Sequence, residues 1–541
     1  MPVVELSYSR LEKLIGKVSR KQILESLPYL GLDIESESKD EIRIEYSPNR
    51  PDYSTDFGIA LGMQGLLGTK KGLYKLKISS GSSNKILVDS SVSKIRPYVT
   101  SIIAKNGSID DAAIRQLMVM QEDLHFGIGR RRKKSSIGIH DLDTISFPLK
   151  YTTTDKNHKF IPLNSNQEQT IADILKNTDV GRDYGAILGN STKFPIIIDS
   201  KGKTVSFPPI INASMTTVTT KTKNLLVEVT GINKDDVEDS LSVVATILQS
   251  AGFKLQTVKI SGSNNSSPIL KNRKLTFDHE LVNKALGTNL NPSLMCLCLK
   301  KSRLDAVSKG KKIECTIPRY RFDIFGPMDL VEEVALGYGI QNLKPVLSPS
   351  LTVGHKNEFS EKLQTLSLVL VGLGFTEALN SSLTSERILY NSTQRNPQDG
   401  ISVVDSKSQE HTILRDSLLP GLIENLSRNI HEQYPQKLFE IGTVFSLGNP
   451  INETTHVACI SAHQSSNFTE IKSIMQSMLK TAFNLESQTK TSSEPLFKKG
   501  RSAKIILNGN SIGTIGEIDS TIIENFKIRV PVVGFEINLP G

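Results

Sequence analysis

The chain has few cysteines for its length, and their arrangement argues against two kinds of structural site. Its 541 residues include four cysteines: Cys296, Cys298, Cys315 and Cys459. No CxxC pair and no matching histidine cluster accompanies them, so neither a zinc site nor a disulfide framework is indicated. We expect these residues to be free thiols in the protein interior, in a reducing compartment.

Long hydrophobic runs and a secretory leader are also missing. No segment approaches the ~18 consecutive apolar residues that a membrane span needs. The first residues, MPVVELSYSRLEKLIG, lack a basic region followed by an apolar one. We therefore expect a cytoplasmic protein that has no membrane association. The C-terminal part, from Glu358 onward, also lacks a glycine-rich phosphate loop and a spacing typical of a Ser-His-Asp triad.

Positive charge is only slightly in excess, with 65 Lys and Arg residues against 56 Asp and Glu residues. This balance is compatible with a polyanionic partner but does not by itself indicate one. The densest charged feature is a run of five cations: Arg130, Arg131, Arg132, Lys133 and Lys134. Such a run is either a solvated loop or a site that neutralises RNA phosphates.

The length predicts three to four domains. Three stretches rich in small polar residues and proline read as linkers: residues 79–84, 261–268 and 345–354. They divide the chain into four modules with the boundaries 1–80, 85–262, 269–345 and 355–541. Since strands and helices are mixed in them, we expect an α+β multidomain protein.

Hydrophobic periodicity and turn signals place the main elements. Helices are expected over 57–67, 239–251, 280–286 and 359–373, and strands over 98–104, 225–229, 438–445 and 532–539. The second module is β-rich. The fourth alternates helices and strands, which predicts an antiparallel sheet covered by helices.

Acidic residues cluster in the third module, within residues 317–335. A proline break followed by a helix start at Asp329 places Asp329, Glu332 and Glu333 on one helix face. Asp323 approaches from the preceding extended segment. Four carboxylates without a counter-charge favour Mg²⁺ over zinc. A capping box, with Asp329 at the cap and Glu332 three residues later, explains the same spacing without a metal.

The strand LLVEVTG, residues 225–231, carries two polar residues with a spacing of two. Alternation along a strand puts Glu228 and Thr230 on the same face, where they can line one pocket. A solvated strand face is the alternative interpretation.

Four motifs, in order along nearly the whole chain, resemble those of phenylalanine–tRNA ligase β subunits of the archaeal and eukaryotic type. The motifs are SPNRPD with its following helix, RRRKKSSIGIHDLDTI with SFPPIINAS and LLVEVTG, IPRYRFDIFGPMDLVEEVALGYG, and LRDSLLPGLIENLSRN with KLFEIGTVF. The resemblance implies an N-terminal module, a B3/B4 tRNA-editing domain, and a B5 domain similar to nucleic-acid-binding folds. The fourth module is then similar to a class II synthetase domain that has lost catalysis.

The family's functional residues carry over to matching positions. The resemblance implies a Mg²⁺ site shared with an α subunit at Asp323, Asp329, Glu332 and Glu333. It implies an editing pocket at Ser206, Glu228, Thr230 and Ile197, although the family commonly has Asp where this chain has Glu228. His140 and Asp141 also lie in a family motif, for which we expect a structural role.

The resemblance further implies an (αβ)₂ heterotetramer that charges phenylalanine tRNA. ATP is a substrate of this complex and binds the α subunit, because the fourth module lacks the arginine expected two residues before Glu440 and the Gly-x-x-Arg expected after residues 534–539. Arg130, Arg131, Arg132 and Lys133 are the expected tRNA contacts. Two alternatives stay open: a non-enzymatic tRNA- or DNA-binding paralogue, and a free-standing hydrolase of mischarged tRNA.

Overall fold

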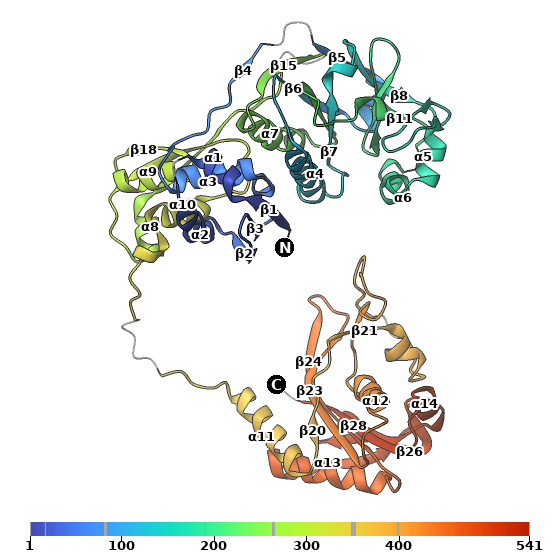
Figure 1. Cartoon of the computed structure of the whole chain (residues 1–541). Coiled ribbons are helices and arrows are strands. Elements are labelled where there is room, and N and C mark those ends of the chain that lie inside the picture. The colour runs from blue at the N-terminus through green and yellow to red at the C-terminus, as the bar shows by residue number, and fades with distance from the viewer. Residues whose placement is uncertain are drawn as a thin grey trace. The chain divides into compact units, whose positions relative to one another are not determined.

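The computed structural model describes residues 2–16, 18–80, 84–189, 191–261, 266–347, 353–397 and 400–539. The chain divides into two units, residues 1–347 and 348–541, and each unit has its own core (Figure 1). Much of each expected linker, at 81–83, 262–265 and 348–352, lies outside the described residues. No helix among the described residues is long and apolar enough to cross a membrane.

The N-terminal part of the first unit is a small sheet covered by helices. The sheet has the order β1 (Val3–Ser7), β3 (Glu41–Glu45), β2 (Asp33–Glu37), and the helices are α1 (Tyr8–Ile15), α2 (Arg20–Ser26) and α3 (Asp56–Leu66). Ile42 and Ile44 alternate with exposed residues along β3 and pack into the core of this part. The expected helix at 57–67 is confirmed as α3.

The largest sheet of the first unit has eleven strands among the described residues. Its main path runs β13 (Ile211–Asn212), β12 (Thr204–Phe207), β11 (Phe194–Ile198), β8 (Leu149–Thr154), β5 (Lys85–Val88), β15 (Lys254–Ile260), β6 (Tyr98–Lys105), β14 (Leu225–Gly231), β7 (Ser135–Asp141). β4 (Ile78–Ser79) and β16 (Ser266–Ser267), at the edges of two expected linkers, also pair with β15. Small polar residues therefore continue the sheet where only linkers were expected.

Two helices, α4 (Asp111–Phe126) and α7 (Lys234–Ser250), pack against one face of this sheet (Figure 1). Val227 and Val229 of β14 belong to that helix-covered core. Leu226, Glu228 and Thr230 alternate with them and so point to the opposite face. Helix α7 begins five residues before the expected start, because Asn233 caps it by accepting from two backbone amides of the first turn.

The last part of the first unit has a three-stranded sheet with three helices. The strands have the order β17 (Arg273–Asp278), β19 (Lys312–Ile317), β18 (Asp305–Lys309), and the helices are α8 (His279–Leu286), α9 (Pro292–Lys301) and α10 (Pro327–Tyr338). The expected start of α10 at Asp329 is wrong. The helix begins at Pro327, since proline is well suited to the first helical position, and Asp329 is its third residue.

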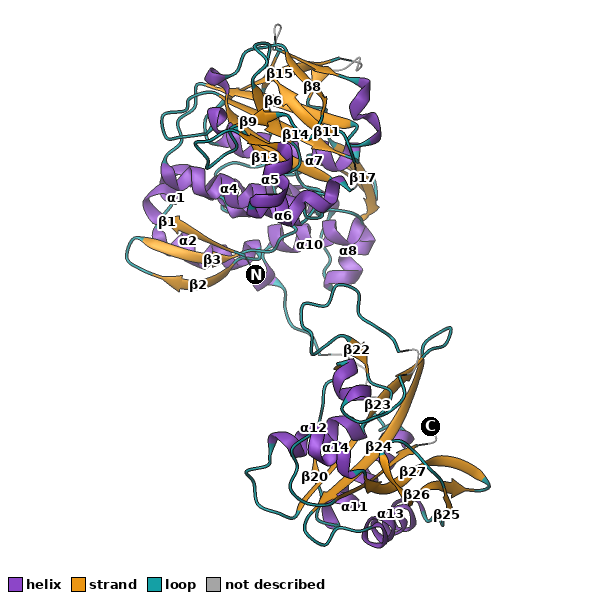
Figure 2. Ribbon diagram, turned by 90° about the vertical axis from the view of Figure 1, so that its right-hand side faces the viewer, coloured by secondary structure: helices purple, strands orange, loops and turns teal. Residues whose placement is uncertain are grey.

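The second unit is a seven-stranded sheet between two layers of helices (Figure 2). Its order is β20 (Thr376–Glu377), β23 (Gln436–Ser446), β24 (Asn452–Ala462), β28 (Val532–Asn538), β27 (Asn510–Ile518), β26 (Phe497–Leu507), β25 (Gln488–Thr491). The strands pair antiparallel, as expected, except that β20 pairs parallel with β23.

Alternating residues of β24 fill two cores. Cys459 packs with α11 (Glu358–Gly372) and α13 (Phe468–Phe483), whereas Ala458 and Ile460 pack with α12 (Leu419–Arg428) and α14 (Ser520–Asn525). All four cysteines are buried free thiols, which confirms that expectation.

Candidate functional site

The helix-free face of β14 carries a buried polar cluster. We call Gly138, His140, Ser206, Glu228 and Thr230 the β14 cluster. Ser206 and Glu228 lie on strands that are distant in the sheet order, yet the Ser206 hydroxyl donates to Glu228 Oε1 at 2.9 Å. The sheet therefore curls back on itself. Glu228 is only 3% exposed and Thr230 is fully buried, so the solvated-face interpretation is wrong.

Ile197 forms part of the apolar wall beside the cluster. It lies directly opposite Ser206 in the β11–β12 ladder, and the register shifts immediately after it. Its side chain is fully buried, in a hydrophobic group with Tyr151, Val205 and Leu226. The structure thus brings Ile197, Ser206 and Glu228 together, with Ile197 as a packing residue.

His140 joins this cluster, which sequence reasoning missed. Its Nε2 lies 3.7 Å from Glu228 Oε1, and its Nδ1 lies 2.9 Å from Thr216 Oγ1. Since the Thr216 hydroxyl donates to the Ala213 carbonyl, it accepts from His140, and Nδ1 carries the proton. In the neutral ring Nε2 is then an acceptor that faces a carboxylate.

Two atoms of the cluster have no hydrogen-bond partner among the residues that the structure describes. They are His140 Nε2 and Glu228 Oε2, and both side chains are at least 96% buried. Buried polar atoms are normally satisfied, so each orphan needs an explanation. Both atoms accept hydrogen bonds, and a molecule with two donors, such as water or an amine, satisfies both at once.

Gly138 makes room for this pair of acceptors. It lies opposite Glu228 in the β7–β14 ladder. A Cβ atom at this position would stand 2.5 Å from both Glu228 Oε1 and His140 Nε2, closer than real Cβ contacts. Any side chain here therefore displaces the Glu228 carboxylate and the His140 ring. The sequence signal for this role is the spacing of two between Gly138 and His140 on one strand.

Thr230 faces a second residue that sequence reasoning missed, Arg96. Arg96 Nε donates to Thr230 Oγ1 at 3.0 Å, and the Arg96 side chain is 2% exposed. Burial lowers the pKa of Arg96 to about 10, a shift that electrostatic interactions with Tyr151 and Glu228 oppose. Asp141, by contrast, has a structural role, since it accepts from the Thr222 hydroxyl at 2.6 Å at the end of β7.

The basic run forms a loop, residues 130–134, which we call the basic loop. Arg130, Arg131 and Lys133 are exposed, as a phosphate-binding site requires. Arg132 is different: it pairs with Glu122 at 2.8 Å and lies 4.2 Å from the centre of the Tyr184 ring. Its guanidinium also donates to the Ile210 carbonyl at 3.0 Å. Arg132 thus anchors the loop to the unit.

The histidine before the basic loop has a structural role. His125 Nε2 accepts from the Ile137 amide at 2.8 Å, and its Nδ1 lies 3.1 Å from Glu122. Burial lowers the pKa of His125, which keeps the ring neutral and suits that acceptor role.

The carboxylates of the third module gather around a guanidinium. Arg321, 2% exposed, donates to Asp323 at 2.8 Å and also to Glu333. Asp329 does not cap its helix as expected. It is the third helical residue and reaches back to accept from the Phe325 and Gly326 amides at 2.6 and 2.8 Å. Within the described ranges, no group of three or more His, Cys, Asp or Glu side chains converges on one metal position.

Glu332 is the exposed member of this group. Partial burial raises its pKa, and the neighbouring charges of Glu333, Asp329 and Asp323 raise it further, while Arg321 lowers it. Its carboxylate therefore stands in a negative field. The donor set around it is all oxygen, and two of the four carboxylates are neutralised by Arg321.

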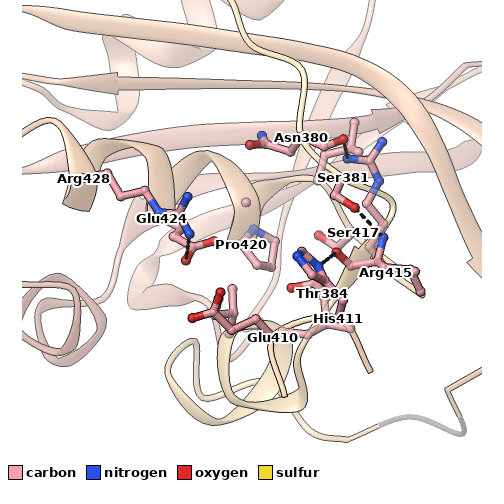
Figure 3. Close-up of a pocket in the computed structure, with 15 residues that line it drawn as sticks. Asn380, Ser381, Thr384, Glu410, His411, Arg415, Ser417, Pro420, Glu424 and Arg428 are labelled. Atoms are coloured by element: carbon pink, nitrogen blue, oxygen red, sulfur yellow. Dashed lines mark hydrogen bonds and ion pairs between the residues drawn. The ribbon is translucent and has the colours of Figure 1, made fainter. Parts of the chain in front are cut away.

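The second unit holds a polar pocket beside α12 (Figure 3). On its sheet side, Arg415 donates to the fully buried Glu440 at 2.5 Å, and Asn380 donates to the other carboxylate oxygen at 2.7 Å. Glu424 and Arg428 pair on the helix side. The cavity measures about 110 Å³. That is less than the ~150 Å³ that holds one benzene ring.

A second buried carboxylate on the same sheet is also fully paired. Glu536 on β28 lies 2.7 Å from His456 Nδ1 and accepts from the Ser417 hydroxyl at 2.6 Å. These hydrogen bonds, His456 first, lower the pKa of Glu536 against the effect of burial. Both carboxylates are therefore occupied by groups of the protein itself.

Comparisons with known proteins agree along the whole chain. Three family models match it: the B3/4 domain over residues 124–247, the tRNA synthetase B5 domain over 275–340, and the phenylalanyl tRNA synthetase beta chain CLM domain over 344–539. The phenylalanine–tRNA ligase beta subunit of Archaeoglobus fulgidus is 38% identical, over 100% of this chain and 98% of its own length. That of Methanocaldococcus jannaschii is 36% identical over 100% of both.

A solved structure shows the same similarity for the first unit. An N-terminal fragment of the phenylalanyl-tRNA synthetase beta subunit from Pyrococcus horikoshii is 30% identical, with a TM-score of 0.59. The match covers 62% of this chain and 99% of the fragment. With relatives of this identity over their full length, the chain belongs to the family of phenylalanine–tRNA ligase beta subunits.

Proposed function

We propose that this chain works with an α subunit to attach phenylalanine to its tRNA and hydrolyses tyrosine from mischarged tRNA at the β14 cluster. The relatives are named as beta subunits of phenylalanine–tRNA ligase, which supports the partner and the reaction. We further propose an (αβ)₂ assembly, a cytoplasmic location, and the four modules 1–80, 85–262, 269–345 and 355–541.

Aminoacylation takes place on the α subunit in this proposal. The second unit is then a class II synthetase-like domain without catalysis, because the arginine expected two residues before Glu440 is missing. Its buried carboxylates are also committed to Arg415 and His456 rather than to a substrate. The purified chain alone is expected to show no phenylalanine-dependent ATP–pyrophosphate exchange, and to support exchange once the α subunit is added. Robust exchange by the chain alone contradicts this division.

An editing site compensates for the limited selectivity of the synthetic site between phenylalanine and tyrosine. An apolar pocket for phenylalanine rejects tyrosine, which adds one hydroxyl, by only ~10²-fold. A second site with polar walls reverses the preference, because phenylalanine leaves buried polar groups unpaired at a cost of about 1–3 kcal/mol. Ser206, next to the apolar Ile197 in the β11–β12 ladder, and Thr230 offer such polar groups, because a hydroxyl can both donate and accept.

The single observation that carries the proposal is the pair of unpartnered acceptors, His140 Nε2 and Glu228 Oε2. A water molecule that donates to both presents its oxygen lone pairs to an ester carbonyl. Holding a water in this orientation lowers the entropic part of the barrier. The carboxylate or the imidazole takes the water proton as the water oxygen bonds to the carbonyl carbon. The ester C–O bond then breaks, and the ribose oxygen of the tRNA leaves with that proton as a hydroxyl, so the products are free tyrosine and uncharged tRNA. The neighbouring terminal hydroxyl of the tRNA assists.

Filling the space at Gly138 tests the site. A complex with Gly138→Val is expected to accumulate tyrosyl-tRNA when supplied with tyrosine, because the added side chain displaces the Glu228 carboxylate and the His140 ring. Gly138→Ala is the smaller variant for the same purpose. Phenylalanine charging reports that each complex is folded. If Gly138→Val charges phenylalanine normally and accumulates no tyrosyl-tRNA, the placement of the editing site is wrong.

We propose that Mg²⁺ binds at Asp329 and Glu332, the two carboxylates that Arg321 does not pair with, where the α subunit or water completes its coordination. Mg²⁺ is usually held by one or two carboxylates and keeps several waters, so this pair suffices. The two other expected ligands, Asp323 and Glu333, form ion pairs with Arg321. In this proposal they contribute negative charge around the ion without binding it. The ion stabilises the contact between subunits in this proposal.

A further inference from the structure

Arg96 and Arg303 are buried arginines that form no ion pair among the described residues. Two other buried arginines, Arg321 and Arg415, each contact a carboxylate. The contacts of Arg96 are hydroxyl and carbonyl oxygens instead, although its side chain is 2% exposed. A buried cation without a contacting anion is costly and is retained where it has a specific role.

The partners of Arg96 lie in two places. One set is at the β14 cluster, where Arg96 donates to Thr230 Oγ1 at 3.0 Å, to the Thr230 carbonyl at 2.8 Å and to Ser136 Oγ at 3.0 Å. The other set is in the basic loop, where it donates to the carbonyls of Arg132 at 3.2 Å and Lys133 at 3.3 Å. One guanidinium therefore joins the cluster to the loop.

The basic loop depends on such external support. Arg130, Arg131 and Arg132 have φ angles of 49°, 55° and 63°, so three successive residues other than glycine adopt the left-handed conformation. That region is unfavourable for residues with a Cβ atom and persists only where the surroundings fix it. The bonds from Arg96 to the Arg132 and Lys133 carbonyls act directly on this backbone.

We propose that Arg96 is a positioning residue that couples RNA binding at the basic loop to the alignment of Thr230 in the β14 cluster. The inference rests on the proposed editing function. When phosphates fix the loop, its carbonyls fix the guanidinium, and the guanidinium fixes the Thr230 hydroxyl. Its positive charge also acts on Glu228 across the cluster. Lysine cannot replace it, since one ammonium lacks the planar fork that reaches both sets of partners.

The test uses the complex with the α subunit and single-turnover hydrolysis of tyrosyl-tRNA at a series of complex concentrations. This design separates the hydrolysis rate at saturation from the apparent affinity. Thr230→Val is expected to lower the rate about tenfold, and Arg131→Ala to weaken the affinity several-fold. Arg96→Lys is expected to do both, with the rate reduced at least tenfold and the affinity weakened at least threefold, while phenylalanine charging stays within twofold.

A double-mutant cycle separates coupling from simple loss of stability. Arg131→Ala weakens the affinity by a certain factor in wild type and by another factor in the Arg96→Lys background. If Arg96 holds the loop in its binding geometry, the factor in the Arg96→Lys background is at least threefold smaller than the factor in wild type. Ser136→Ala, which removes one partner of Arg96 and keeps its charge, serves as the second variant should Arg96→Lys not assemble, and the same non-additivity is expected for it.

Two results overturn the inference. The first is an Arg96→Lys complex with the hydrolysis rate and the tRNA affinity of wild type. The second is a double-mutant cycle in which the effects of Arg96→Lys and Arg131→Ala on the free energy of binding are additive. A wild-type complex that does not hydrolyse tyrosyl-tRNA overturns the proposed function instead, and is recognised before any variant is measured.

Discussion

Replacing Glu228 with glutamine separates its charge from its shape. The amide keeps the side-chain volume, and its oxygen can accept from Ser206 as Oε1 does now at 2.9 Å. The unpartnered Oε2 then becomes an NH₂ group, which donates and cannot accept from a water molecule. A positioned acid or base typically contributes 10²–10⁴-fold to a rate. Glu228→Gln should therefore slow hydrolysis of tyrosyl-tRNA by about 10²–10⁴-fold, or about 2.7–5.4 kcal/mol of activation free energy.

Stability should change little in this variant. Glu228→Gln removes a buried charge whose second oxygen has no partner, and it leaves the packing intact, so the free energy of unfolding should shift by only about 1 kcal/mol. Phenylalanine charging should be unchanged because the synthetic site is on the α subunit. Glu228→Asp is the matched control, since it keeps the charge at shorter reach and should lose less activity than glutamine. The assay is single-turnover hydrolysis of preformed tyrosyl-tRNA by the complex. Equal rates for wild type and Glu228→Gln, to within threefold, refute the role of this carboxylate.

Three further predictions concern other parts of the chain. Asp329→Ala and Glu332→Ala should each weaken Mg²⁺-dependent association with the α subunit, measured by analytical ultracentrifugation with and without Mg²⁺. If these residues only stabilise the end of the helix, each substitution costs ~1 kcal/mol of stability and the magnesium dependence of association is unchanged. Neutralising the exposed cations Arg130, Arg131 and Lys133 should weaken tRNA binding. It should also reduce the slope of the logarithm of the binding constant against the logarithm of the salt concentration by up to about three. An unchanged slope indicates that the loop is solvated and does not contact phosphates. Burial raises the pKa of Asp56 from 3.8 to about 6, although Arg10 opposes the shift. The native state therefore binds this proton more tightly than the unfolded state does. As a result, the contribution of Asp56 to stability grows as pH falls from 7 through 6 toward 4. The free energies of unfolding of wild type and Asp56→Asn, measured by urea titration, should therefore differ most at pH 7, by up to about 3 kcal/mol in favour of Asn, and converge near pH 4. A difference that does not change with pH contradicts this prediction.

The sequence predicts the elements of the site better than its contacts. Alternation along residues 225–231 places Glu228 and Thr230 on one strand face, and the structure has them there. The contact between Ser206 and Glu228 depends on how the sheet curls, which local patterns do not encode. Gly138 and His140 share a face with them by the same alternation. However, only the register of β7 against β14 shows that Gly138 stands opposite Glu228.

Arginine partners were the hardest feature to predict. The pattern of carboxylates around α10 reads as a metal site or a cap, and neither interpretation includes Arg321, because its ion pair with Glu333 joins residues on different elements. Likewise, a run of cations gives no sign that Arg132 turns inward to Glu122 while its neighbours stay exposed. Arg96 reaches Thr230 from 134 residues away in the sequence, a contact that only the fold creates.

The most direct test of the account is the hydrolysis of two preformed substrates by the wild-type complex of this chain with its α subunit. Tyrosyl-tRNA and phenylalanyl-tRNA, made on the same phenylalanine tRNA, are followed in parallel without ATP. We expect tyrosyl-tRNA to be deacylated at least tenfold faster than phenylalanyl-tRNA, because only tyrosine pairs with the buried hydroxyls of the β14 cluster. Equal rates for the two substrates, or no hydrolysis of tyrosyl-tRNA above the rate in buffer, contradict the account.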